Sequence, residues 1–181
     1  MHKDVERILF TEERIHEAVS GIAAHITSDY ADSSGLIVVG ILKGACVFMT
    51  DLIREIKLDC TIDFMVAKSY GNSTVSSGNV RILKDLDSDI AGMDVLIVED
   101  ILDTARTLSA VKTYLLGKRP ASVKICTLLD KVAAEKVGDV RADYKCFDVE
   151  NEFVVGYGLD YAEHYRNLSY IGVLKRSVYE H

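Results

Sequence analysis

Apolar residues along the chain alternate between helix-like spacing and uninterrupted strand-like runs. Between residues 15 and 26 they recur every three or four positions, which predicts an amphipathic helix that starts at Thr11 and has Glu12 and Glu13 in its first turn. The same reasoning predicts helices over 45–56 and 107–116. Continuous apolar or β-branched runs predict strands over 36–42, 61–67, 81–86, 95–98, 123–129, 153–155 and 170–174.

Strand and helix alternate through the middle of the chain, and the strands are apolar on both faces. This pattern is typical of a mostly parallel sheet covered by helices on both sides. Ligands bind such sheets beyond the carboxyl ends of the strands. Because Lys43, Glu99 and Lys131 each follow a predicted strand, we expect them to meet at one rim. The length and the continuous patterning predict a single domain over 1–181.

Composition narrows the classes of function. The hydrophobic share of 49% fits a globular protein, and the net charge of −7 argues against a general nucleic-acid binder, which needs a basic face. The four cysteines lack the close pairs of zinc or redox motifs. Apolar stretches fall short of the roughly 18 residues of a membrane span, and the first residues lack a signal-peptide pattern. We therefore expect a cytoplasmic protein with no membrane partner.

Residues 95–108 carry the strongest chemical signal. A β-branched run ends at Glu99 and Asp100, Asp103 follows, and two threonines precede helical spacing. A strand that enters a helix through a hydroxyl-rich turn can present backbone N–H groups to a phosphate. Two carboxylates about 4 Å apart repel by roughly 1 kcal/mol in water, so Glu99 and Asp100 are expected to face sugar hydroxyls, a divalent cation, or both. A phosphate beside a diol describes a ribose 5-phosphate.

This segment resembles the phosphoribosyl-diphosphate loop of the type I phosphoribosyltransferases, and further motifs extend the resemblance. Their order and spacing are similar to the hypoxanthine-guanine branch of that family. The motifs are Gly40-Ile41-Leu42-Lys43-Gly44-Ala45, Ser69-Tyr70-Gly71, Leu128-Leu129-Asp130-Lys131 and Phe153-Val154-Val155-Gly156-Tyr157-Gly158-Leu159-Asp160-Tyr161. The resemblance implies an α/β type I phosphoribosyltransferase fold. In that fold, helices flank a twisted, mostly parallel sheet, and the terminal segments form a small hood over the C-terminal rim of the strands.

The resemblance also implies roles for the acidic loop. Glu99 and Asp100 hold the ribose hydroxyls, directly or through Mg²⁺, and Asp103 acts as the general base near N7 of a purine. Without the resemblance, Glu99 and Asp100 are also compatible with a polar strand end, and Asp103 is compatible with the start of a helix. The implied 5-phosphate site comprises Asp103, Thr104, Ala105, Arg106 and Thr107.

Pyrophosphate is implied to bind at Leu42, Lys43 and Gly44, where the family carries a loop that often contains a non-proline cis peptide bond. Arg166 corresponds to a further pyrophosphate contact. Asp160, which the resemblance also places at the purine site, corresponds to the ligand of a second Mg²⁺ on pyrophosphate. The implied metal ligands are therefore Glu99, Asp100 and Asp160.

The purine base is implied to contact Lys131, Phe153, Val154 and Asp160. Lys131 donates to O6, which favours 6-oxopurines because an ammonium group cannot accept a hydrogen bond from a 6-amino group. Phe153 stacks on the ring, and backbone groups near Val154 contact its edge. The segment led by Ser69 and Tyr70 is implied to form a lid that excludes water from the reaction centre.

The implied protein is a purine salvage enzyme that uses Mg²⁺. It transfers phosphoribose from 5-phosphoribosyl 1-diphosphate to N9 of hypoxanthine or guanine, which gives IMP or GMP and pyrophosphate. It has no nucleic-acid partner and forms a homodimer or homotetramer. Two other classes share the acidic loop. One is a regulator that senses phosphoribosyl diphosphate, which normally adds a basic DNA-binding segment; the other is a transferase for orotate or adenine, against which Lys131 and Phe153 argue.

Three positions depart from the family pattern. Ala105 stands where the family usually has glycine; at positive φ the alanine costs about 1 kcal/mol, whereas at negative φ nothing is lost. Residues 132–135 replace the proline and arginine that commonly follow the lysine at position 131, and Ser169 replaces a proline.

Overall fold

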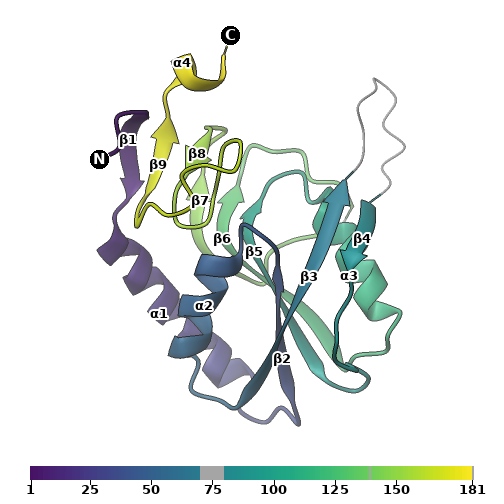
Figure 1. Cartoon of the computed structure of the whole chain (residues 1–181). Coiled ribbons are helices and arrows are strands. Elements are labelled where there is room, and N and C mark those ends of the chain that lie inside the picture. Colours follow the sequence, from purple (N-terminus) through teal and green to yellow (C-terminus); the bar gives the residue numbers. More distant parts are fainter. Residues whose placement is uncertain (70–79, 139, 181) are drawn as a thin grey trace.

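The computed structural model describes residues 1–69, 80–138 and 140–180 (Figure 1). The helices in this range are α1 (Glu12–Asp29), α2 (Cys46–Glu55), α3 (Arg106–Leu116) and α4 (Arg176–Tyr179). The strands are β1 (Val5–Phe10), β2 (Leu36–Ile41), β3 (Cys60–Ser69), β4 (Val80–Lys84), β5 (Asp94–Leu102), β6 (Ser122–Lys131), β7 (Tyr144–Val149), β8 (Val154–Val155) and β9 (Ile171–Leu174).

The central sheet has the strand order β4-β3-β2-β5-β6-β7. Neighbouring strands from β3 to β7 pair in parallel, and β4 pairs antiparallel with β3 at one edge. This is the mostly parallel α/β sheet that the sequence predicts. Because the carboxyl ends of parallel strands meet at one edge, the residues that follow β2, β5 and β6 share a rim.

Helices cover both faces of this sheet. Val38 of β2 belongs to the buried cluster formed with α1 and α2, whereas its neighbour Val39 belongs to the cluster formed with α3. Successive side chains of a strand point to opposite faces, so both faces must be apolar, and all of β2 is buried. This double burial explains why the strands lack an alternating polar pattern.

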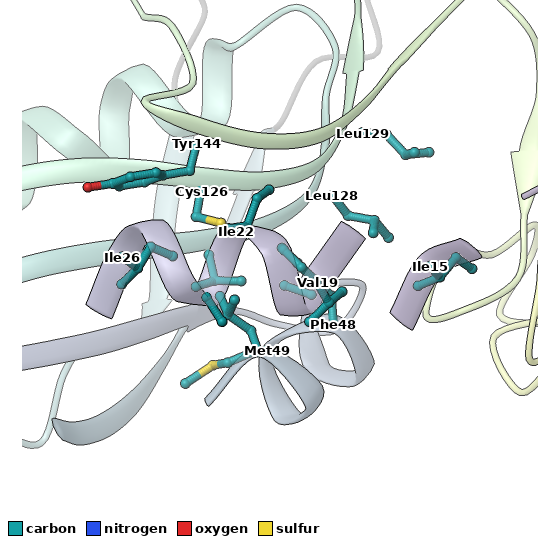
Figure 2. Packing of buried hydrophobic residues seen from close by; sticks show 14 of the residues in the cluster. Ile15, Val19, Ile22, Ile26, Phe48, Met49, Cys126, Leu128, Leu129 and Tyr144 are labelled. Atoms are coloured by element: carbon teal, nitrogen blue, oxygen red, sulfur yellow. The ribbon is translucent and has the colours of Figure 1, made fainter. Parts of the chain in front are cut away.

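Helix α1 begins and packs as predicted. The hydroxyl of Thr11 accepts a hydrogen bond from the backbone N–H of Arg14 at 3.3 Å, which caps the first turn. Figure 2 shows residues of α1 packed with Phe48 and Met49 of α2. The buried positions of α1 are the predicted ones: Ile15, Val19, Ile22, Ala23 and Ile26.

Strand β5 is longer than the sequence indicates. The apolar run predicts a strand that stops at residue 98, but β5 continues to Leu102, and Glu99 pairs with Thr127 of β6. Ladder hydrogen bonds join backbone groups, so a carboxylate side chain does not end the pairing. Glu99 and Asp100 therefore project from the last residues of a strand rather than from the turn after it.

A second, antiparallel sheet has the strand order β1-β9-β8. Val5 pairs with Leu174, and Val154 pairs with Val173, so segments from the two ends of the chain form it. Figure 1 shows this sheet and α4 at the end of the molecule where the main strands have their carboxyl ends. We call β1, β8, β9 and α4 the hood.

Three elements have no counterpart in the sequence prediction: β1, β7 and α4. Strand β1 has one fully buried side chain and three exposed ones, and β7 mixes buried and exposed positions. Helix α4 has only four residues. Such short or half-exposed segments produce no clear periodic signal. None of the helices in the described residues is long and apolar enough to cross a membrane.

Candidate active site

A cavity of about 320 Å³ opens at the rim of the central sheet. Four separate segments line it: the end of β2 and the loop after it, Ala67 of β3, the stretch from the end of β5 into α3, and the loop before β9. The predicted site residues along its wall are Leu42, Lys43, Gly44, Glu99, Asp100, Asp103, Thr104, Ala105, Arg106, Thr107, Asp160 and Arg166. Sequence reasoning did not anticipate the apolar part of the wall, formed by Ile41, Ala67, Ile101, Leu102 and Leu108.

The turn between β5 and α3 forms the floor of the cavity. Ala105 is the N-cap of α3 and has the left-handed backbone conformation, with φ 61° and ψ 3°. This resolves the question that the sequence leaves open, because the position has the positive φ that usually favours glycine. No described side chain caps α3, so the positive end of this helix faces the cavity and suits an anion.

Glu99 and Asp100 share a half-buried position beside this turn. Among the described residues, Oε2 of Glu99 is buried and has no hydrogen-bond partner. Burial raises the pKa of Glu99 well above its usual value, and the adjacent charge of Asp100 raises it further. Burial also raises the pKa of Asp100, although the charge of Arg166 and the N–H of Ile101 oppose this effect. Of the two acids, Asp100 thus has a donor in the N–H of Ile101, whereas Oε2 of Glu99 has none among the described residues.

The loop after β2 approaches Asp100 closely. The peptide bond between Leu42 and Lys43 is cis, as the family resemblance implies. A Cβ atom on Gly44 would overlap the carboxylate of Asp100. A Cβ atom on Gly158, which has φ +100°, would overlap the carbonyl oxygen of Gly44. Both glycines are therefore required for the loop after β2, the end of β5 and the loop before β9 to converge on one site.

Two of the cationic side chains in the cavity wall, Lys43 and Arg166, pair with acidic residues. Nη2 of Arg166 lies 2.8 Å from Oδ1 of Asp160, and its Nη1 donates to the carbonyl of Gly158 at 2.8 Å. Nζ of Lys43 lies 3.0 Å from Oε2 of Glu163, which Arg166 also approaches at 3.3 Å. Sequence reasoning missed Glu163, because its only local signal is a position three residues before an arginine.

Lys131, which the resemblance implies to contact the purine, lies next to the cavity wall through its contact with Asp103. Its Nζ lies 3.3 Å from Oδ2 of Asp103 and 3.5 Å from Oδ1 of Asn151. The ammonium is largely buried, with 14% of its side chain exposed, whereas Asp103 is half exposed. The resemblance assigns Lys131 to O6 and Asp103 to N7, which are neighbouring atoms on one edge of a purine. The side chains of Lys131 and Asp103 thus lie together.

Phe153 and Val154 lie outside the wall of this cavity, in the hood. Phe153 directly precedes β8 rather than beginning it, and its carbonyl accepts the N–H of Leu174 at 2.8 Å. Its side chain is 38% exposed, whereas Val154 is buried. Of the expected lid, Ser69 ends β3 and Tyr70 lies outside the described residues.

The implied metal ligands do not form a preformed cage. Within residues 1–69, 80–138 and 140–180, no three His, Cys, Asp or Glu side chains are grouped as metal ligands. Glu99 and Asp100 lie at the end of β5, and Asp160 pairs with Arg166 in another loop. This separation agrees with Mg²⁺ chemistry, because the ion keeps several waters and commonly binds one or two carboxylates together with substrate phosphates.

Fold and site define a phosphoribosyl transferase, an enzyme that transfers a pentosyl group. The sequence model of the phosphoribosyl transferase domain matches residues 8–162, and the chain belongs to this family.

Individual relatives narrow the family further. The chain is 52% identical over 180 residues to the hypoxanthine-guanine phosphoribosyltransferase of Bacillus subtilis (strain 168), with 99% of both chains covered. It is similar to a crystal structure of a hypoxanthine phosphoribosyltransferase from Staphylococcus aureus, with TM-score 0.95, 47% identity and coverage of 100% of this chain and 97% of that one. It is also 49% identical over 179 residues to the bifunctional protein TilS/HprT of Listeria monocytogenes serotype 4b (strain F2365). That match covers 99% of this chain but spans only 27% of the Listeria protein.

Proposed function

We propose that the protein transfers phosphoribose from 5-phosphoribosyl 1-diphosphate to N9 of hypoxanthine or guanine, which yields IMP or GMP and pyrophosphate. One observation carries this proposal. The cavity combines a helix N-terminus, a pair of underpaired carboxylates and two cations, and Lys131 lies at its edge against Asp103. An anion site, a diol site and a purine-edge site are thus adjacent, as a phosphoribosyl donor and a 6-oxopurine require.

The donor substrate fits the two ends of the cavity. The 5-phosphate binds the turn from Asp103 to Thr107 at the start of α3, and the ribose hydroxyls bind Glu99 and Asp100. Pyrophosphate then reaches Lys43 and Arg166. When the C1–oxygen bond breaks, its electron pair leaves with pyrophosphate, and these two cations stabilise the departing charge. Because they now pair with Glu163, binding exchanges a carboxylate for the phosphate oxygens.

The purine is activated on its N7–O6 edge. N9 supplies the electron pair that forms the new bond to C1, and Asp103 accepts the proton from N7. Lys131 donates to O6, and a 6-amino group cannot replace this acceptor. Phe153 supplies a stacking surface, and the backbone near Val154 contacts the edge of the base. Asp160 belongs both to the purine site and, as a ligand of Mg²⁺, to the pyrophosphate site. The segment that begins with Ser69 and Tyr70 acts as a lid over the reaction centre.

Mg²⁺ is the proposed cofactor. Carboxylate oxygens are the ligands that the ion prefers, and the unpartnered Oε2 of Glu99 fits a site that is completed by a ligand. Glu99 and Asp100 would hold one ion at the ribose, and Asp160 would hold a second at pyrophosphate. When bound, the ions neutralise phosphate charge and orient the donor.

The test is an incubation of the protein with 5-phosphoribosyl 1-diphosphate and Mg²⁺ together with each of hypoxanthine, guanine, xanthine, adenine and orotate. We expect nucleotide and pyrophosphate in equal amounts with hypoxanthine or guanine, and no product with adenine or orotate. Product from adenine or orotate alone would contradict the assigned role of Lys131. Tight donor binding without product from any base would instead indicate a regulator.

The proposal also covers the domain organisation, the location, the partners and the oligomeric state of the protein. We propose one domain over 1–181 that acts in the cytoplasm, without nucleic-acid or membrane partners; the acidic net charge of −7 supports the absence of a nucleic-acid partner. We also propose a homodimer or homotetramer, which is supported by the family resemblance. Sedimentation velocity at micromolar concentration tests it, and a monomer would refute it.

A further inference from the structure

Three aromatic rings cluster beside the hood, and the proposed reaction assigns a role to only one of them, Phe153. Phe153 and Tyr179 are stacked, with ring centroids 4.9 Å apart and planes 26° apart. Phe153 and Tyr161 meet edge to face at 5.4 Å and 87°. The two tyrosines are themselves 6.4 Å apart. Tyr179 comes from α4, so the last helix of the chain reaches the residue that the proposed function assigns to purine stacking.

The two tyrosines leave one face of the Phe153 ring uncovered. If they lay over opposite faces, the distance between them would approach the sum of their distances to Phe153. The measured 6.4 Å is far shorter than that sum, so they do not cover opposite faces. Phe153 nevertheless remains 38% exposed. Neither tyrosine therefore covers the ring face opposite Tyr179.

Helix α4 is fixed to the hood independently of this ring contact. The backbone N–H of Lys175 donates to the carbonyl of Asp4 at 2.9 Å, and its Nζ donates to the carbonyl of Lys3 at 2.6 Å. Val178 packs against the buried cluster of Val5, Val155 and Leu174. Tyr179 thus extends from an anchored element, and its ring can restrain Phe153.

We propose that Tyr179 is a positioning residue that holds the Phe153 ring in the plane on which the purine base stacks. The inference rests on the proposed function. A phenylalanine without a backing ring would lose rotamer freedom when the base binds, and that loss weakens binding about three- to tenfold. When the Tyr179 ring is in place, the Phe153 side chain is already ordered before the base binds. The effect falls on the purine and not on the phosphoribosyl donor, whose site lies in the rim cavity.

The test compares Tyr179→Ala, Tyr179→Phe and the wild type in steady-state kinetics. We expect Tyr179→Ala to raise KM for hypoxanthine about three- to tenfold, with KM for 5-phosphoribosyl 1-diphosphate and kcat within twofold. Tyr179→Phe retains the ring and should restore the wild-type KM. Tyr114→Ala removes an equivalent ring from α3, where Tyr114 is 39% exposed, and should leave both KM values unchanged.

Each result separates positioning from general stability. A wild-type purine KM in Tyr179→Ala would overturn the inference, and so would an equal rise in both KM values or a lack of rescue by Tyr179→Phe. If Tyr179→Ala unfolds at the assay temperature, Tyr179→Leu keeps apolar volume without a planar ring and carries the same expectation. A wild-type protein that makes no product from any purine would overturn the proposed function, and the inference with it.

Discussion

Two groups of buried carboxylates in this protein have opposite surroundings. Asp63 of β3 is 6% exposed, and it accepts backbone hydrogen bonds from Phe64, Asp87 and Ser88 at 2.7–3.1 Å. Nζ of Lys84 lies 3.5 Å away. Burial alone would raise the pKa of Asp63, but these donors outweigh it and hold the pKa below its usual value.

Glu99 and Asp100 show the reverse. Burial and mutual repulsion raise the pKa of Glu99, and Oε2 has no partner among the described residues. A buried acid with a full set of donors stabilises the fold, whereas a buried acid without them costs free energy that only a ligand can recover. The comparison predicts that loss of a rim carboxylate harms activity, and that loss of Asp63 harms stability.

The largest effect is expected for Asp103→Asn. Removal of the proposed general base should lower kcat by about 10²–10⁴-fold, while the melting temperature changes little because Asp103 is half exposed. Steady-state kinetics with hypoxanthine, together with calorimetric binding of IMP, measure both. Unchanged turnover would remove Asp103 from the mechanism.

Gly44→Ala should come next. The new Cβ overlaps the carboxylate of Asp100, so either the loop or the acid must shift, and a displacement of about 1 Å can cost about 10²-fold in rate. The measurement is kcat/KM for 5-phosphoribosyl 1-diphosphate. Gly21→Ala is the matched control, because nothing lies within 4 Å of its new Cβ. In the middle of α1 that change should stabilise by about 0.5–1 kcal/mol without an effect on rate.

Asp63→Asn tests the prediction that loss of Asp63 harms stability rather than activity. The neutral side chain cannot match the accepting capacity of the carboxylate, so the free energy of unfolding should fall by about 1–3 kcal/mol, while kcat remains within twofold. Urea denaturation and steady-state assays separate the two quantities. A loss of activity without a loss of stability would place Asp63 with the rim acids.

The pH dependence of this contribution has a definite sign. The pKa of Asp63 lies below its ordinary value of 3.8 in the folded protein, so the unfolded chain binds its proton first as the pH falls. The stabilisation is therefore present above pH 3.8 and is lost as the pH drops through the lower folded pKa. Asp63→Asn should flatten the acid limb of the stability curve, measured by urea denaturation at several acidic pH values.

Glu99→Gln should move stability in the other direction. Removal of an unpartnered buried charge is expected to raise the free energy of unfolding by about 1 kcal/mol without ligand or metal, and to weaken the donor affinity. Urea denaturation in EDTA checks the first effect, and titration with 5-phosphoribosyl 1-diphosphate checks the second. A destabilised Glu99→Gln protein would show that Glu99 has structural partners, like Asp63.

The chemistry of the rim could be predicted from the sequence because it is local. Residues 99–107 are contiguous, so their order alone indicates acids beside a helix start, and apolar runs identify the strands that position them. The boundary between β5 and the turn that follows it was harder to predict. The end of β5 at Leu102 depends on pairing with β6, and no single-segment pattern contains that information.

The hood could be predicted only in part. The apolar runs at 153–155 and 170–174 indicate β8 and β9, whereas β1 and the four-residue helix α4 were missed. Helix α4 is held by contacts with residues far away in the chain, such as the bond from Lys175 to Asp4. Glu163 and Tyr179 can be identified only from their contacts in the folded chain, with Lys43 and Arg166 in the first case and with Phe153 in the second. Sequence periodicity reports burial along one element, whereas the hood is defined by which elements meet.

The smallest effect is expected for Ala105→Gly, in the turn between the two carboxylates and α3. Alanine in the left-handed conformation costs about 1 kcal/mol, which glycine relieves. Glycine in turn loses about 0.5–1 kcal/mol of chain entropy and the buried methyl contact of Ala105 with the α3 cluster. These terms nearly cancel, so thermal unfolding should shift by only a few degrees, and kcat should stay within a few-fold. A change of a hundredfold in kcat would mean that the turn geometry, and not the acids beside it, limits the reaction.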